Sequence, residues 1–282
     1  MKNRLWKLIL LVLVGLVVWL LWANRALEQT TYSISSEKLP DAFEGFRIVH
    51  ISDLHNTEFG QDNEKLLKMV AVAKPDLIAI TGDVIDSRRT DMDIAFRFVQ
   101  EAAKIAPCYY VTGNHESRLD DYDRLKDGLQ ERGVVILEDG SVNMERDGAV
   151  IRVLGVDDPA FVPVYSPEEI SALMDVKLRN IQPDNEIFTI LLSHRPELFD
   201  VYVQHGLNLV LTGHAHGGQV RMPWIGGLYM PGQGLFPEYD AGMFAENGTT
   251  MIISRGLGNS AFPLRVNNRP EVVVIELHST TK

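Results

Sequence analysis

The sequence has 282 residues, of which 45% are apolar and 23% charged, and its net charge is −11. This acidic balance argues against a general nucleic-acid-binding protein, because a phosphate backbone is bound by a basic surface. The single cysteine, Cys108, excludes an intramolecular disulfide, and we expect it to be a buried core thiol. About 240 residues remain after the first segment, enough for one sizeable α/β domain.

The N-terminal segment predicts a membrane anchor. Basic residues Lys2, Arg4 and Lys7 precede an uninterrupted apolar stretch at 8–23, and tryptophans stand near both of its ends. With its flanks, the stretch just meets the length of about 20 residues that a helix needs to cross a bilayer. Because the positive charge lies before the segment, we expect a single-pass protein of the cell membrane. Its N-terminus is cytoplasmic and its main domain lies on the extracytoplasmic side.

Two other interpretations of this segment stay open. A cleaved signal peptide has the same charged start and apolar middle, although residues 20–23 lack a clear small-x-small cleavage site. A buried core helix would be unusual, because the segment is apolar all round and stands alone at the terminus. We therefore divide the chain into an anchor at 1–24, a stalk or linker at 25–44 with an edge strand near 31–34, and a folded domain at 45–282.

Strands and helices alternate along the first half of the domain, and strands dominate the second half. The expected strands are 46–51, 77–80, 109–112, 133–137, 141–145, 149–156, 188–192, 207–211, 217–222, 249–254 and 271–277. The expected helices are 63–73, 92–103, 122–132, 167–178 and 196–204. A glycine- and proline-rich loop fills 223–248. This order predicts two packed, mostly β layers with helices outside.

Five short polar clusters that hold metal-binding residue types each follow an expected strand. They read Asp53-Leu54-His55, Gly82-Asp83, Gly113-Asn114-His115-Glu116, Ser193-His194 and Gly213-His214-Ala215-His216. Ligands of open α/β sheets gather at the carboxyl ends of strands, so these loops can converge although they lie far apart in sequence. Imidazole, carboxylate and amide donors without thiolate favour manganese, iron or zinc over magnesium or calcium. We expect two divalent metal ions, which the two oxygens of one carboxylate can bridge.

Two such ions suit the hydrolysis of a phosphate ester. Ions about 3.5 to 4 Å apart can share a hydroxide, lower its pKa and stabilise charge on the phosphoryl oxygens. The leaving alkoxide still needs a proton, and His115 beside Asn114 is the expected donor, since an imidazole holds a proton near neutral pH. Asp86, three residues after Asp83, is expected to orient His115 by accepting its other N–H, with a simple N-cap as the alternative role.

The ordered clusters resemble the pattern of the calcineurin-like metallophosphoesterases: D-x-H, G-D-x-x-D, G-N-H-[DE], an isolated H, and G-H-x-H. Every position is present in that order between residues 53 and 216. With its anchor, the chain also looks like the membrane-bound bacterial YaeI/YkuE-like phosphodiesterase branch. The resemblance implies an α/β fold of the four-layer α-β-β-α sandwich type. It assigns Asp53, His55, Asp83 and His216 to one ion and Asp83, Asn114, His194 and His214 to the other, with His115 as the acid.

Together these features predict a membrane-anchored, dinuclear-metal phosphoesterase that cleaves a phosphodiester or pyrophosphate bond by attack of a metal-bound hydroxide. Its substrate is expected to be a phosphate-ester small molecule or a lipid-linked molecule, and no nucleic acid is expected as a partner. The oligomeric state stays open. The alternatives are a catalytically weak, metal-dependent adaptor and a metallonuclease.

Weaker candidates surround the main motifs. Arg195 is expected to form a structural salt bridge rather than to contact a phosphate, and Asn56 is a candidate substrate contact. Glu116 is interpreted as a carboxylate of the loop or helix start. Arg265 is a weaker candidate still. The 223–248 loop is either a lid or plain connecting sequence.

Overall fold

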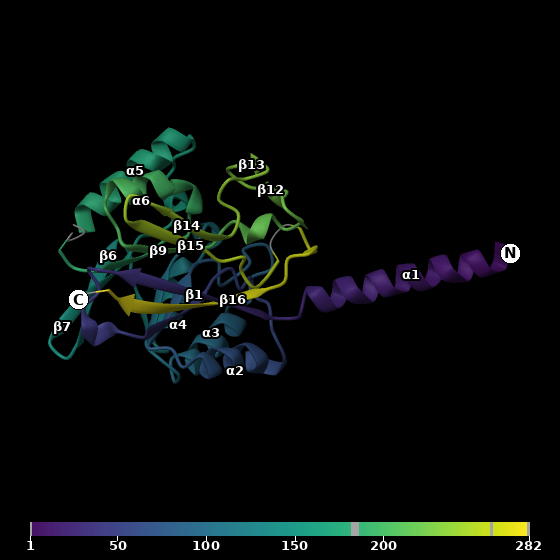
Figure 1. The fold of residues 1–282 in the computed structure, drawn as a ribbon, viewed down its shortest axis with the longest axis horizontal. Helices are drawn as coiled ribbons and strands as arrows, with labels where there is room; N and C mark the ends of the chain where they lie inside the picture. Colours follow the sequence, from purple (N-terminus) through teal and green to yellow (C-terminus); the bar gives the residue numbers. More distant parts are fainter. Residues whose placement is uncertain (1, 182–185, 260–261, 281–282) are drawn as a thin grey trace.

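The computed structural model describes residues 2–181, 186–259 and 262–280. It contains one isolated helix, α1 (Lys2–Ala23), which projects from a layered α/β domain (Figure 1). The stretch Arg4–Ala23 has a mean hydropathy of 2.5, and of its residues only the last, Ala23, is buried against the rest of the protein. The helix is therefore long and apolar enough to cross a membrane, and it is not a core helix of the domain. A signal sequence would have the same properties.

The first sheet has six strands in the order β1-β16-β2-β3-β4-β5. They are β1 (Glu28–Ser36), β16 (Glu271–Ser279), β2 (Phe46–Ile51), β3 (Leu77–Thr81), β4 (Cys108–Val111) and β5 (Val134–Ile136). Strands β2 to β5 are parallel, β16 runs antiparallel to β2, and β1 is parallel to β16. Three helices cover the outer face: α2 (Glu64–Ala73), α3 (Met92–Ala102) and α4 (Tyr122–Gln130).

The second sheet also has six strands, in the order β14-β15-β9-β8-β7-β6. They are β14 (Gly242–Glu246), β15 (Thr249–Ile253), β9 (Leu209–Thr212), β8 (Thr189–Leu192), β7 (Ala149–Gly155) and β6 (Gly140–Arg146). A turn at Asp147-Gly148 joins the antiparallel pair β6 and β7. Helices α5 (Pro167–Ile181) and α6 (Phe199–Gln204) cover this sheet from outside.

The two sheets pack face to face, and the pleat decides which side chains meet between them. In β3, Leu77 and Ala79 point into the core between the sheets, whereas Ile78 and Ile80 pack against the helices. The second sheet alternates in the same way, with Ile190 inside and Leu191 under its own helices. Because the central strands are buried on both faces, their sequences are nearly continuous apolar runs. The expected four-layer α-β-β-α sandwich is confirmed.

Short elements connect these layers. Two small hairpins, β10 (Arg221–Met222) with β11 (Gly226–Gly227) and β12 (Tyr229–Met230) with β13 (Gly234–Leu235), occupy the glycine-rich segment. The single 3-10 turns are η1 (Asp41–Phe43), η2 (Gln61–Asn63), η3 (Glu116–Arg118), η4 (Pro159–Phe161), η5 (Pro196–Leu198) and η6 (His216–Gly218).

The structure departs from the sequence expectations in three places. Residues 25–44 are not a free stalk, because β1 forms the edge of the first sheet and Leu39 and Phe43 are buried in its core. Residues 217–222 were expected to form a strand, but η6 precedes the two-residue strand β10 there. The expected loop at 223–248 also contains β14, which pairs with β15.

Candidate metal centre

The polar clusters converge at one edge of the sandwich. Asp53, Asp83 and Asn114 follow β2, β3 and β4 of the first sheet, while His194 and His214 follow β8 and β9 of the second. These strands are parallel within each sheet, so their carboxyl ends lie at a common edge. All the predicted ligands are at least nine-tenths buried. The fold thus brings together side chains that lie up to 163 residues apart.

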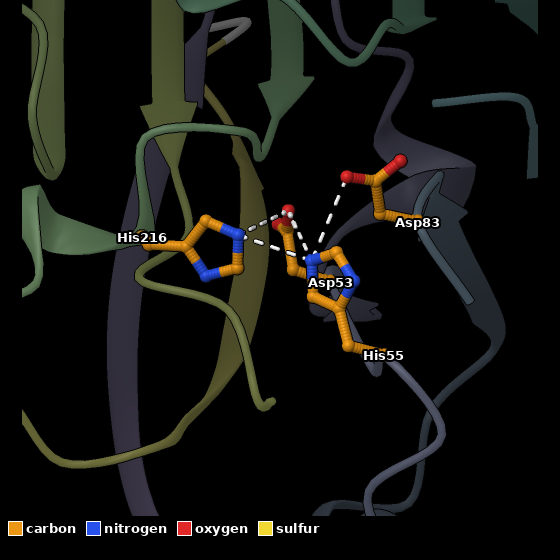
Figure 2. Close-up of side chains that lie close together, drawn as sticks. All are labelled: Asp53, His55, Asp83 and His216. Carbon is orange, nitrogen blue, oxygen red and sulfur yellow. Dashed lines mark hydrogen bonds and ion pairs between the residues drawn. The ribbon is translucent and has the colours of Figure 1, made fainter. Parts of the chain in front are cut away.

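One group consists of Asp53, His55, Asp83 and His216, whose side chains point toward a common centre (Figure 2). Nε2 of His55 lies 3.1 Å from Nε2 of His216, and the latter lies 3.3 Å from Oδ1 of Asp53. Oδ2 of Asp83 lies 3.6 Å from Nε2 of His55. Oδ1 of Asp53 is buried without a hydrogen-bond partner among the described residues. A buried acceptor of this kind fits a cation better than an empty core.

The second group consists of Asp83, His194 and His214. Nε2 of His194 lies 3.4 Å from Oδ2 of Asp83 and 3.2 Å from Nδ1 of His214. Nδ1 of His194 lies 2.8 Å from the carbonyl oxygen of Thr81, to which it donates when protonated. That contact leaves the lone pair of Nε2 directed at the group, as in many metal-binding histidines. The same oxygen of Asp83 therefore takes part in both groups.

Asn114 lies beside these groups between two residues that contact Asp83. The backbone N–H of His115 donates to Oδ1 of Asp83 over 2.8 Å, and an added Cβ at Gly113 would lie 2.3 Å from that oxygen. Oδ1 of Asn114 is buried and has no hydrogen-bond partner among the described residues. An amide oxygen in this state is a suitable further donor for the second group.

The distances within both groups fit two divalent ions. Bonds of roughly 2.0 to 2.2 Å from an ion to nitrogen and oxygen put two ligands of that ion roughly 3 to 3.5 Å apart. The closest contacts between donor atoms, from 3.1 to 3.6 Å, lie close to this range. The buried aspartates and histidines therefore suit a pair of divalent metal ions, as the sequence predicted.

The electrostatic environment keeps the carboxylates charged and two histidines neutral. Burial opposes ionisation of Asp83, but the neighbouring imidazoles, above all His194, outweigh it and hold the pKa of Asp83 well below its usual range. Burial holds the pKa of His214 well below its usual range, and the positive charge of Arg195 lowers it further. The pKa of His216 falls to about 3, mainly through burial. Neutral imidazole is the form that binds a metal ion.

His194 behaves differently from these two histidines. Burial opposes its positive charge, but the nearby carboxylate of Asp83 outweighs this effect and raises the pKa of His194 to about 10. An ion bound between the two side chains would replace that proton as the positive charge, since metal binding and protonation compete for the same lone pair.

Backbone strain is concentrated in the same loops. Asp53, His55, Asp83, His214 and His216 all have positive φ, between 46° and 64°. Residues other than glycine adopt this left-handed conformation rarely, and such strain collects at functional sites. Gly82 has a φ of 81°, and an added Cβ there would lie 2.5 Å from the backbone nitrogen of Gly113. The loops after β3 and β4 thus approach each other too closely for a side chain at this position.

His115 and Asp86 also lie together. Oδ1 of Asp86 is 3.5 Å from Nδ1 of His115, and the backbone N–H of Ser87 donates to the same nitrogen over 3.1 Å. The neutral imidazole therefore carries its proton on Nε2. Asp86 also accepts the backbone N–H of Arg88, so it caps the turn as well as facing His115. The ring of His115 lies 4.5 Å from that of His55, and burial lowers the pKa of His115 to about 4.

Glu116 has a role that sequence reasoning missed. Its carboxylate is fully buried and accepts three backbone N–H groups, from Asp83, Val84 and Gly113, over 2.7 to 2.9 Å. It thereby ties the loop after β3 to the loop after β4. Burial, and then the charge of Asp83, raises the pKa of Glu116 to about 7. The fourth position of the G-N-H-E motif was the available signal, but it did not reveal these backbone partners.

Two arginines lie behind the histidines of the second sheet. Arg195 forms the expected salt bridge, with two bonds of 2.6 and 2.8 Å to Asp158, and its Nη1 lies 3.1 Å from Nε2 of His214. Arg265 is fully buried, and its Nη2 lies 3.3 Å from Nδ1 of His216. Each guanidinium lowers the pKa of the histidine that it faces. No sequence signal had pointed to the partner of Arg265.

A groove leads from the first group toward α1. A cavity of about 420 Å³ is lined by His55, Asp86 and Arg89, and also by Asn56, Thr57, Asn259 and Pro263. The last four residues also line a neighbouring cavity of about 620 Å³, which reaches Leu21, Asn24 and Arg25 at the end of α1. The candidate centre is therefore connected to the base of the N-terminal helix.

The chain is similar to several known proteins. A family model described as calcineurin-like phosphoesterase matches residues 46–218. The uncharacterized metallophosphoesterase YkuE of Bacillus subtilis is 30% identical over 90% of this chain and 86% of its own length. Phosphodiesterase YaeI of Escherichia coli is 26% identical over 82% of each chain. The crystal structure of TT1561 from Thermus thermophilus matches at a TM-score of 0.51 with 15% identity, over 76% of this chain and 90% of that chain, which shows the common fold.

Proposed function

The chain belongs to the calcineurin-like phosphoesterase family and is a metal-dependent phosphoesterase, and we propose that it cleaves a phosphodiester or pyrophosphate bond at the membrane surface. The observation that carries this proposal is the position of Asp83, whose Oδ2 takes part in both groups of potential ligands. A single carboxylate oxygen shared in this way suits a centre with two ions rather than two separate sites.

The proposed ligands are divided between two ions. Asp53, His55, Asp83 and His216 would hold one, and Asp83, Asn114, His194 and His214 the other. Nitrogen and oxygen donors without sulfur favour manganese, iron or zinc. When bound, such a pair lowers the pKa of water and neutralises charge on the phosphoryl oxygens.

We propose that His115 donates the proton that the leaving group needs. In the neutral ring Nδ1 accepts the Ser87 N–H, and the proton is on Nε2. To act as the acid, the ring would first take up a second proton on Nδ1, which the carboxylate of Asp86 would accept as a hydrogen bond; transfer of the Nε2 proton to the leaving oxygen would then leave a neutral imidazole. The side chain is nearly inaccessible to solvent, which limits competition from water. A phosphate ester in the groove would bring negative charge, which raises the pKa of a buried imidazole. Asp86, 3.5 Å from Nδ1, would favour the same change.

We further propose that α1 is an uncleaved anchor with its N-terminus in the cytoplasm and that the domain is extracytoplasmic. Its uninterrupted apolar stretch at 8–23 and the basic residues before that stretch support this topology. The groove that runs from His55 to Leu21 supports a substrate held in the same membrane. A phosphate ester linked to a lipid could place its phosphate at the centre while its apolar part stays near α1.

The test of the proposed activity uses the full chain in detergent. We expect hydrolysis of bis-p-nitrophenyl phosphate with added manganese, loss of activity with a chelator, and recovery when metal returns. Metal analysis should find close to two ions per chain. Protein that carries two ions and cleaves no phosphate ester would refute the assignment, whereas an unchanged chain mass in membranes would support the uncleaved anchor.

A further inference from the structure

The segment 223–236 exposes apolar side chains and carries no charge. Its fourteen residues contain no Asp, Glu, Lys or Arg, although 23% of the whole chain is charged. Trp224 is fully exposed, and more than half of the surface of Ile225, Tyr229, Leu235 and Phe236 is accessible. Elsewhere in the folded domain, the exposed apolar residues include the single Val72 on α2 and a smaller group at Phe161, Val162 and Tyr165. A contiguous apolar group of this kind marks an interaction surface.

A second apolar segment lies beside the first. Phe262 and Leu264 are also exposed, and no charged residue occurs between 256 and 264. The two segments are joined where Val220 pairs with Val266 and where the N–H of Arg221 donates to the carbonyl of Val266 over 3.0 Å. The exposed apolar residues of these two joined segments are together called here the apolar face. Its members are Trp224, Ile225, Tyr229, Leu235, Phe236, Phe262 and Leu264.

The apolar face is fixed to the base of α1. The side chain of Asn24 accepts the backbone N–H of Arg265 over 2.7 Å and donates to its carbonyl over 3.0 Å. Arg269 donates to the carbonyls of Ala26 and Leu27, and its guanidinium lies 5.2 Å from the ring centre of Trp22. The last turn of α1 is thus attached to the segment that carries Phe262 and Leu264. Figure 1 shows β12 and β13 in the half of the domain from which α1 leaves.

We propose that the apolar face is seated in the interfacial layer of the bilayer that α1 spans. The inference rests on the proposed anchor, and it adds a second, non-spanning contact made by the folded domain. Tryptophan and other aromatic residues are favoured at the depth of the headgroups, where a segment without charge can enter. A free soluble partner would not explain why the face lies next to the exit of α1.

Such a contact would orient the groove. Pro263 and Asn259 line the groove and lie in the segment that carries Phe262 and Leu264. With the apolar face in the headgroup layer, the opening beside Leu21 and Arg25 would lie at the lipid surface. A lipid-linked substrate could then reach the centre without leaving the bilayer.

Trp224 provides the reporter for a test, because the other three tryptophans all lie in α1. The triple variant W6F/W19F/W22F is reconstituted as the full chain in phosphatidylcholine vesicles, with and without bromine on the acyl chains near the headgroup. We expect bromine to quench Trp224 emission by about twofold or more and iodide to quench it weakly, because interfacial tryptophan contacts lipid. The brominated lipid is present in both leaflets, so bromine quenching does not depend on the orientation of the protein in the vesicle.

The matched control moves the tryptophan to α5, which Figure 1 places at the far end of the domain from α1. The chain W6F/W19F/W22F/W224F/V176W has its one tryptophan at a half-exposed position of that helix. We expect iodide to quench this residue and bromine to leave it unchanged. Equal bromine quenching at both positions, or none at Trp224, would overturn the inference. If Trp224 is shielded from iodide but is not quenched by bromine, a second copy of the chain covers it instead of lipid. This result would also overturn the inference.

Activity separates this inference from the proposed function. The variant W224E/F236E should hydrolyse soluble bis-p-nitrophenyl phosphate at the rate of the parent, because neither residue lies in the centre or the groove. Its hydrolysis of a diacylglycerol p-nitrophenyl phosphate diester in vesicles should fall about tenfold. An equal rate on the vesicle substrate would count against the docking role. If the parent cleaves neither ester, the phosphoesterase assignment fails while the quenching result stands.

Discussion

The two sheets contribute different chemistry to the candidate centre. The first sheet supplies both aspartates, the asparagine, His55 and the proposed acid His115, whereas the second supplies only His194, His214 and His216. All the negative charge among the proposed ligands therefore comes from one sheet. The second sheet adds neutral donors, two of which face an arginine.

The sheets also stabilise their loops differently. In the first sheet, the carboxylate of Glu116 binds the backbones of two neighbouring loops. In the second, Arg195 and Arg265 lie against the outer nitrogens of the histidines. Asp83 is the residue that takes part in both groups. The first sheet therefore sets the charge of the centre, and the second sheet completes its ligand shells.

Asp83→Ala should have the largest effect on activity, because it removes the one ligand that the two groups share. We expect turnover of bis-p-nitrophenyl phosphate to fall by about 10⁴-fold, since both ions lose a ligand and charge stabilisation is lost with them. Metal analysis should find fewer than one ion per chain. The exposed Asp123 on α4 provides the control, and Asp123→Ala should keep parent values. Two retained ions in Asp83→Ala would contradict a shared ligand.

His115→Ala should test the acid of the first sheet without disturbing the ions. We expect loss of about 10²- to 10⁴-fold with an alkyl leaving group, the range attributed to general acid catalysis. The loss should be smaller with p-nitrophenolate, which leaves without a proton. Metal content should stay near two. His205→Ala, a change at a histidine that pairs with Asp175, is the control. An equal loss for both leaving groups would argue against the proton-donor role.

Paired single-ligand variants test the contribution of each sheet separately. His55→Ala removes a donor of the first sheet from one ion, and His214→Ala removes a donor of the second sheet from the other. We expect each variant to keep about one ion, and to recover part of its activity at raised manganese concentration, since mass action opposes a weakened site. Loss of both ions from either variant would show that the two sites are filled only together.

Glu116→Gln should have the smallest effect on activity and a clear effect on stability. One carboxylate oxygen becomes an amide nitrogen, which then faces a backbone N–H and leaves it unsatisfied. We expect a loss of about 1 to 3 kcal/mol in the free energy of unfolding, or roughly 3 to 10 °C in Tm. The exposed Glu131 is the control, and Glu131→Gln should keep the parent Tm. An unchanged Tm for Glu116→Gln would mean that the loops do not depend on this carboxylate.

Much of the fold could be predicted because its signals are local. Apolar runs gave the central strands, and polar residues directly after them indicated which loops would meet. The residues with distant partners could not be predicted. The pairing of β1 with β16 joins segments that lie more than 200 residues apart, so residues 25–44 resembled a stalk. Arg265 donates to two backbone carbonyls and Glu116 accepts three backbone N–H groups, and the positions of those groups depend on the finished loops.

The place of β16 in the first sheet bears on how the protein is made. This strand separates β1 from β2 and pairs with β1 from Glu28 opposite Glu271 to Ser36 opposite Ser279. Until the ribosome has added residues 271–279, β1 and β2 each have an unpaired edge, because the strand between them is missing. Maturation of the domain must therefore wait until β16 has been synthesised, long after α1 has emerged. A nonsense codon before residue 271 would leave a polypeptide in which β1 and β2 each have an unpaired strand edge, and such a polypeptide is prone to aggregation and degradation.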